Sequence, residues 1–195
     1  RSRRSSSLSA AEDNLELLDL SRAFDPDFRQ QSGKSAYVRI TRGCNKFCTY
    51  CVVPNTRGAE VHRPPDTIVD ECRALVKSGT VEITLLGQTV NHYRYTHGIA
   101  MNAEGREVPQ IGPGISAFKK PIEENQKVTT FAMLLRKIHD EVPELQRLRF
   151  VTSYPIDFGD DILNTMRDCP RICNYLHVPA QSGSNAILKK MNRGY

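Results

Sequence analysis

Short runs of apolar and β-branched residues recur along the chain, and segments with helical spacing of apolar residues separate them. Four runs have the composition of strands, namely 36–41, 81–86, 147–151 and 175–178. Four later or intervening segments have the amphipathic period of helices, namely 66–79, 130–141, 160–168 and 185–191. We expect Asp66 to cap the first of these helices and Gly79 to close it. This alternation of strand and helix predicts a parallel sheet with helical crossovers.

The predicted strands share one property at their carboxyl ends. Each is followed by polar or small residues, as in TRGC, GQTVN, TSYP and PAQSGS. Parallel sheets place their chemistry at this edge, so a site is expected there. Four β/α units are too few to close an eight-stranded barrel. The predicted fold class is therefore α/β, with a parallel sheet that is either open or truncated.

Two segments depart from this pattern. Residues 92–128 are rich in Gly, Pro and charge without periodicity, and we expect an inserted loop there. Residues 1–35 are predicted to be a linker with a short helix over 10–22, since Ser9 and Glu12 form a capping-box pattern. The core is then 36–195. The chain begins with Arg1 rather than Met, and we expect it to be a piece of a longer protein.

Composition narrows the class of protein. Of the 195 residues, 39% are hydrophobic and 25% charged, which argues against disorder throughout. No apolar run is long enough to span a membrane. The net charge of +5 falls to +2 without residues 1–10, so charge says little about nucleic acid. Six cysteines and no signal peptide predict reduced thiols in the cytoplasm, with a mitochondrial location as the alternative.

Three of the cysteines are clustered after the first predicted strand. Cys44, Cys48 and Cys51 form a C-x3-C-x2-C pattern, whose soft thiolates suit a thiophilic metal. Structural zinc would need a fourth ligand, for which His62 is the nearest candidate. An iron–sulfur cluster held by three thiolates would leave one iron open to a small molecule. Cys72 is expected in the core.

The other two cysteines, Cys169 and Cys173, lack a third partner close by, and we expect them to serve packing.

The extended motif resembles a known family. The string GCNKFCTYCVVPNTRGAEVHRP is similar to radical S-adenosylmethionine (SAM) methylthiotransferases, and LLGQTVN, LRFVTSYPIDFGDDIL and LHVPAQSGS follow in the family's order. Within that family, the chain most resembles the MiaB-type enzymes that act on isopentenylated adenosine 37 of tRNA. The resemblance covers about 36–91 and 129–195, and it implies a partial (β/α) barrel with an open parallel sheet, about four of the family's six β/α units.

The resemblance implies roles for particular residues. Cys44, Cys48 and Cys51 would hold a 4Fe–4S cluster, whose open iron would bind SAM. The implied SAM-binding residues are Tyr50, Gly87, Gln88, Asn91, Thr152, Ser153, Gln181, Ser182 and Gly183. The implied substrate contacts are Arg57, His62 and Arg63, although His62 and Arg63 also fit a solvated loop. No catalytic residue beyond the cluster ligands is implied.

The same resemblance implies a reaction and partners. Reductive cleavage of SAM would give a 5′-deoxyadenosyl radical that abstracts hydrogen from adenine C2, because that C–H bond is not acidic enough for a general base. The partners would be the tRNA anticodon loop and an electron donor such as flavodoxin or ferredoxin. The enzyme itself would be a monomer. The family's N-terminal domain with a second 4Fe–4S cluster and its C-terminal RNA-binding domain are expected to lie outside this sequence. We therefore expect this chain alone to be inactive in full methylthiolation.

Three alternatives stay open. The substrate of a related methylthiotransferase is a ribosomal protein, and that of another is threonylcarbamoyl-adenosine in tRNA. From a different class, three thiolates also suit a zinc-stabilised nucleic-acid-binding module without catalysis.

Overall fold

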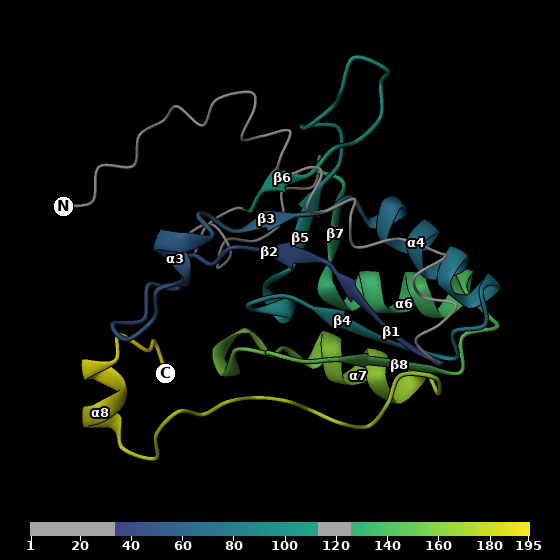
Figure 1. Cartoon of the computed structure of the whole chain (residues 1–195). Helices are drawn as coiled ribbons and strands as arrows, with labels where there is room; N and C mark the ends of the chain where they lie inside the picture. The colour runs from purple at the N-terminus through teal and green to yellow at the C-terminus, as the bar shows by residue number, and fades with distance from the viewer. Residues whose placement is uncertain (1–33, 113–125) are drawn as a thin grey trace.

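A three-stranded parallel sheet forms the centre of the molecule. The computed structural model describes residues 34–112 and 126–195 (Figure 1). The sheet has the order β1-β4-β8, and its strands are Ser35–Arg39, Glu82–Leu86 and Arg147–Phe150. The register places Val38 beside Leu85, and Leu85 beside Phe150. These three side chains are at most 1% exposed, so the sheet is buried at its middle.

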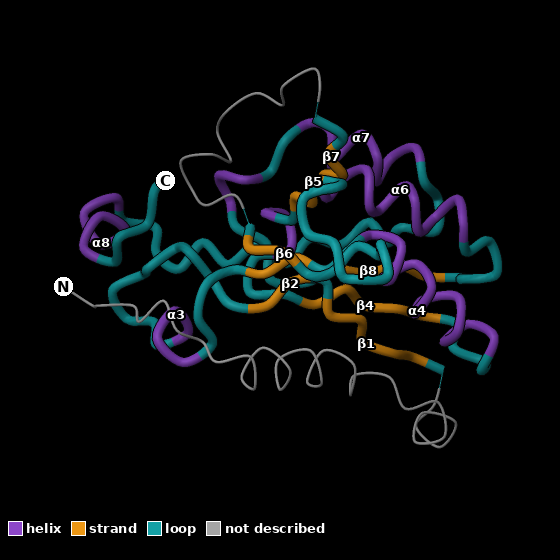
Figure 2. The backbone as a smooth tube through the Cα atoms, turned by 90° about the horizontal axis from the view of Figure 1, so that it is seen from above, coloured by secondary structure: helices purple, strands orange, loops and turns teal. Residues whose placement is uncertain are grey.

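Three helices cover this sheet. They are α4 (Pro65–Lys77), α6 (Phe131–Glu141) and α7 (Asp160–Asp168). α6 lies between the other two and contacts both, as the view from above shows (Figure 2). The apolar faces that the sequence predicted are buried, including those carrying Ile68, Leu134 and Ile162. The α/β class with a parallel sheet is therefore confirmed.

The helix ends show one difference from the prediction. Thr130 caps α6 by accepting a hydrogen bond from the N–H of Met133. Gly79 adopts φ +98° just after α4, in the left-handed region where glycine ends helices. The cap of α4 is Pro64 rather than Asp66, and Asp66 lies in the first turn. Proline at the next position, Pro65, starts this helix because a first-turn residue needs no N–H partner.

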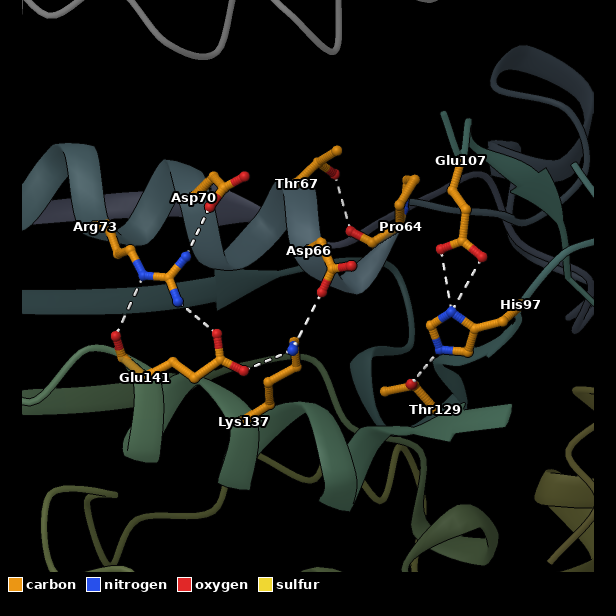
Figure 3. A network of polar contacts seen from close by, with 10 residues as sticks. All are labelled: Pro64, Asp66, Thr67, Asp70, Arg73, His97, Glu107, Thr129, Lys137 and Glu141. Atoms are coloured by element: carbon orange, nitrogen blue, oxygen red, sulfur yellow. Dashed lines mark hydrogen bonds and ion pairs between the residues drawn. The ribbon is translucent and has the colours of Figure 1, made fainter. Parts of the chain in front are cut away.

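Ion pairs join α4 to α6 on the outside of the molecule (Figure 3). Arg73 contacts Glu141 with an N···O distance of 2.5 Å, and Lys137 lies 3.1 Å from Asp66. The first-turn position of Asp66 therefore places its carboxylate toward the neighbouring helix.

Smaller elements surround the carboxyl edge of the sheet. A second, antiparallel sheet contains β2 (Thr41–Arg42), β3 (Val61–His62) and β6 (Gln110–Ile111). A third contains β5 (Arg94–Thr96) and β7 (Val128–Thr130). The short helices are α3 (Val53–Thr56), the 3-10 helices η1 (Val90–His92) and η2 (Pro155–Asp157), and α8 (Asn185–Lys190).

Two sequence predictions are corrected. Residues 175–178 do not form a strand: the chain pairs with β8 only at the parallel bridge of Leu148 and Ile172. Tyr175 and Leu176 are 52% and 42% exposed, so neither face of this segment is covered. Residues 92–128 are not only loop, since β5, β6 and the start of β7 lie within the described part. The helix predicted over 10–22 lies outside the described residues.

Within the described ranges, none of the helices has the length and apolar character needed to cross a bilayer.

Candidate active site

The cysteine loop leaves the carboxyl end of β1 and turns tightly. Gly43 has φ +68°, and a Cβ added there would lie 2.0 Å from the carbonyl oxygen of Ala59. Only glycine fits this close approach. The N–H of Cys44 donates to Gly58 (3.3 Å), and the N–H of Cys51 donates to Cys48 (3.0 Å). These bonds hold the three cysteines on one compact loop.

All three thiols of this loop are free of disulfides. Burial raises the pKa of Cys44, partly opposed by a hydrogen bond from the N–H of Lys46, 3.4 Å from the sulfur. Cys48 is 9% exposed, and the guanidinium of Arg193 donates to its sulfur at 3.2 Å. Hydrogen bonds to cysteine sulfur are one of the means by which proteins tune iron–sulfur sites.

The donor set fits an iron–sulfur cluster. The loop supplies three free cysteine sulfurs, and thiolates are the ligands that hold such clusters. His62 does not supply a fourth ligand to the cysteines here, because its ring contacts Glu60 and the backbone of Arg94.

A polar cavity of about 550 Å³ opens at the carboxyl edge of the sheet. Its lining residues are Arg39, Thr41, Arg42, Arg57, Leu86, Gly87, Gln88 and Thr152. Arg39, Leu86 to Gln88 and Thr152 come from the ends of β1, β4 and β8, as parallel sheets arrange their sites, while β2 and Arg57 after α3 complete the wall. Gly87 has no room for a side chain, since a Cβ would lie 2.2 Å from the Thr41 hydroxyl. Four residues singled out from the sequence meet here, namely Arg57, Gly87, Gln88 and Thr152.

Other predicted SAM residues lie outside the lining of this cavity. Asn91 is 2% exposed, and its amide bonds both the carbonyl and the N–H of Tyr154 at 2.8 Å. Ser153 is buried, and its N–H donates to the carbonyl of His177. Tyr50 is 53% exposed on the cysteine loop.

The remaining three, Gln181, Ser182 and Gly183, lie in the segment before α8, with Gln181 and Gly183 exposed. The structure does not bring this segment to the cavity edge formed by β4 and β8.

His62 and Arg63 are not on a solvated loop, so that alternative is wrong. His62 is completely buried and stacks on Tyr93 at 5.3 Å. One guanidinium nitrogen of Arg63 lies 2.7 Å from both the Arg39 carbonyl and the Glu71 carboxylate. Strand β3 carries this segment inward, where a macromolecular substrate does not reach His62.

The sequence reasoning missed the residues that fix the cysteine loop. Lys46 forms a buried ion pair with Asp157, with an N···O distance of 2.5 Å, and lies over the ring of Tyr154. Arg193 also lies over Tyr154, 4.5 Å from its centroid. The position of Lys46 inside the cysteine motif could have indicated a role in the loop. Arg193 is 145 residues from Cys48, and nothing in the sequence indicates their contact.

This site and fold define a class. Residues 38–195 match the family model described as the Radical SAM superfamily, and the chain belongs to that family. The family implies a 4Fe–4S cluster and SAM, and the free cysteines of the loop are the matching donors.

Curated relatives are more specific. The chain is 49% identical over 160 residues to the tRNA-2-methylthio-N(6)-dimethylallyladenosine synthase of Rhodopirellula baltica, covering 82% of this chain and 28% of that protein. Proteins of the same name from Clostridioides difficile and Clostridium botulinum are 42% and 45% identical, covering 82% and 85% of the chain and 27% and 30% of those proteins. The chain thus spans less than a third of the length of these relatives.

Proposed function

We propose that this chain is the radical SAM core of a tRNA methylthiotransferase that converts isopentenyladenosine 37 into its 2-methylthio derivative. The observation that carries the proposal is the position of three free thiols on one loop, at the sheet edge where the ends of β1, β4 and β8 enclose a polar cavity. The names of the relatives support the tRNA substrate. In this proposal the sheet belongs to an incomplete barrel with about four of six β/α units. The segment at Ile172, which forms a parallel bridge with Leu148 of β8, would take the place of the fourth strand.

Each part of the site has a proposed task. Cys44, Cys48 and Cys51 would hold the cluster, which when bound supplies the electron that cleaves SAM. Gly87, Gln88 and Thr152 would form the wall against which SAM is positioned, because they line the cavity. The guanidinium of Arg57 lines it too and suits an anionic group of SAM or a tRNA phosphate.

The other implied SAM residues remain part of the proposal with different tasks. Asn91 and Ser153 would act by fixing the strand ends, since both are buried. Tyr50, Gln181 and Gly183 are exposed, and together with Ser182 they would approach SAM from the solvent side.

Partners and location complete the proposal. We propose a monomer that takes electrons from a flavodoxin or ferredoxin, with a second 4Fe–4S cluster on a segment outside this sequence. Six free thiols suit a reducing compartment, so we propose the cytoplasm, with mitochondria as the alternative.

Anaerobic reconstitution tests the cluster. We expect about four irons per chain with broad visible absorbance, lost in Cys44→Ala and kept in Cys173→Ala, whose cysteine lies outside the loop. With reductant, the loaded protein should cleave SAM to methionine and 5′-deoxyadenosine. A colourless protein with stoichiometric zinc on the cysteine loop would contradict the proposal and favour the nucleic-acid-binding module.

The substrate needs a separate measurement. The native full-length protein, given isopentenylated tRNA lacking the methylthio group, should produce the 2-methylthio nucleoside detected by mass spectrometry of digested tRNA. Modification of a ribosomal protein or of threonylcarbamoyl-adenosine instead would reassign the substrate while leaving the radical chemistry intact.

A further inference from the structure

A buried group of two histidines and one carboxylate lies beside the cysteine loop, where the N–H of Glu60 donates to the side-chain oxygen of Asn45 at 3.3 Å. We propose that Glu60, His62 and His92 form a binding site for one divalent metal ion, zinc. One ligand atom from each lies within 4.8 Å of the others, and within the described ranges no other group of His, Cys, Asp and Glu meets this criterion. All three residues are at most 1% exposed.

The three side chains converge from two segments. Glu60 and His62 flank Val61 on β3, and His92 ends η1. His62 Nε2 lies 3.0 Å from Glu60 Oε1, and His92 Nδ1 lies 2.8 Å from Glu60 Oε2. Two imidazole nitrogens and a carboxylate are a ligand set that zinc uses with one position left for water. Magnesium and calcium prefer oxygen ligands, so this set favours zinc over them.

The carboxylate already bridges the two rings. Its Oε1 accepts from His62 and its Oε2 accepts from His92, so both oxygens face the space between the three side chains. A zinc ion placed between these groups would replace the two N–H···O bonds with metal–ligand bonds. The buried carboxylate would then face a cation in place of the two ring N–H groups.

The surroundings of His62 suit a metal-bound ring. Its Nδ1 lies 2.9 Å from both the N–H and the carbonyl oxygen of Arg94. In the metal-free state Nδ1 accepts from the N–H and Nε2 donates to Glu60. When Nε2 binds a metal, the proton would move to Nδ1 and be donated to the carbonyl of Arg94, and the N–H of Arg94 would give up its hydrogen bond to the ring. A metal-ligating histidine commonly has such a carbonyl partner, which orients the ring.

Glycine at position 112 packs closely against the ligand atom. A Cβ there would lie 2.7 Å from His62 Nε2, so only glycine allows this approach of the backbone to the ring. The N–H of Gly112 donates to the Glu60 carbonyl at 2.8 Å, so the backbone also fixes the carboxylate-bearing residue. Zinc at this site would join β3 to η1, and the segment that follows β6 would pack against it.

The test measures zinc directly. The purified protein, loaded with its cluster to occupy the cysteines, is dialysed against zinc chloride and its zinc counted by mass spectrometry. We expect one zinc per chain and a higher Tm, because a ligand that binds only the folded state stabilises it. His92→Asn should weaken zinc binding at least about tenfold. His97→Asn is the matched control, since His97 pairs with one carboxylate, Glu107, and with Thr129 (Figure 3).

Cobalt(II) identifies the ligands without a variant. In place of zinc it should give weak visible bands without the intense near-ultraviolet charge transfer of a cobalt–thiolate bond. This result stands even where His92→Asn fails to fold. A thiolate band, equal zinc content in folded His92→Asn, or a Tm unchanged by zinc would each overturn the proposed site. None of these outcomes touches the proposed methylthiotransferase function, which rests on the cysteine loop and the cavity.

Discussion

Asn91 shows how one side chain joins two strand ends. It follows β4 in the LLGQTVN string, and the resemblance assigned it to SAM binding. In the structure its amide oxygen accepts from the N–H of Tyr154, and its amide nitrogen donates to the Tyr154 carbonyl, both at 2.8 Å. An asparagine is needed here because only an amide offers a donor and an acceptor side by side.

We predict that Asn91→Ala lowers the free energy of unfolding by about 2 kcal/mol, because it leaves two buried backbone groups without partners. Urea unfolding followed by circular dichroism measures this. Asn174→Ala, at an exposed position, should change stability by at most about 0.5 kcal/mol. If Asn91→Ala instead keeps its stability and loses SAM affinity, then Asn91 contacts SAM and does not serve to join the two strand ends.

At the scale of elements, regular hydrophobic spacing predicted the helices and strands whose formation depends on residues close together in the sequence. The helices α4, α6 and α7 and the three sheet strands appear where their patterns placed them. The run at 175–178 had the composition of a strand, but a strand also needs a paired neighbour. The chain pairs with β8 only at Ile172 and then departs, so composition alone misled.

The site was predictable to a similar extent. Spacing alone located the cysteine loop, and the strand ends located Gly87 and Thr152 at the cavity. The burial of His62 was not predictable, because it depends on the pairing of β3 with β2 and with β6. The residue of β6 that pairs with His62 is Gln110, which is far from it in the sequence. Short strands of two residues carry no periodic signal.

The stability of the central sheet depends on pH through Glu82 on β4. Its carboxylate accepts from Arg147 at 2.7 Å and from Arg149 at 3.2 Å, both on β8. The hydrogen bond from Arg147 is the largest effect and lowers the pKa of Glu82 below its ordinary value of 4.5. The folded state therefore gains stability above that ordinary value and loses it as the pH falls through the lowered pKa.

We predict that Glu82→Gln removes this part of the acid sensitivity. The variant should be less stable than the wild type at neutral pH, and the two should converge as the pH falls below about 4.5. Urea unfolding at a series of pH values measures the difference. Glu144→Gln, an exposed position, is the control and should run parallel to the wild type. A constant gap between Glu82→Gln and wild type at all pH values would show that packing, not charge, is responsible.

At the scale of the whole molecule, the cysteine loop is held by segments far from it in sequence. The N–H of Thr49 donates to the carbonyl of Met191 at 3.1 Å, and the Asn192 amide donates to the carbonyl of Phe47 at 2.9 Å. Lys46 of the same loop pairs with Asp157 in η2, the short helix that follows β8. The loop therefore keeps its shape only while β1, β8 and the residues after α8 are assembled.

The dependence of the cysteine loop on distant segments can be measured at the Lys46–Asp157 pair. Both side chains are nearly buried, at 6% and 7% exposure, so removing one partner leaves a charge without compensation. We predict that Asp157→Ala lowers the free energy of unfolding by about 3–5 kcal/mol, and that adding Lys46→Met recovers part of the loss. The exposed pair of Arg167 and Asp168 is the control, because Arg167→Ala should cost at most about 1 kcal/mol.

A double-mutant cycle on urea unfolding separates the coupling of Lys46 and Asp157 from the two single effects. Labelling of Cys48 by a thiol reagent under native conditions reports the loop itself, and should be faster in Asp157→Ala than in Arg167→Ala. Equal labelling rates together with a large loss of stability would mean that the pair holds the sheet and not the loop. Faster labelling would show that the geometry of the three thiols depends on the end of β8, which also lines the cavity proposed for SAM.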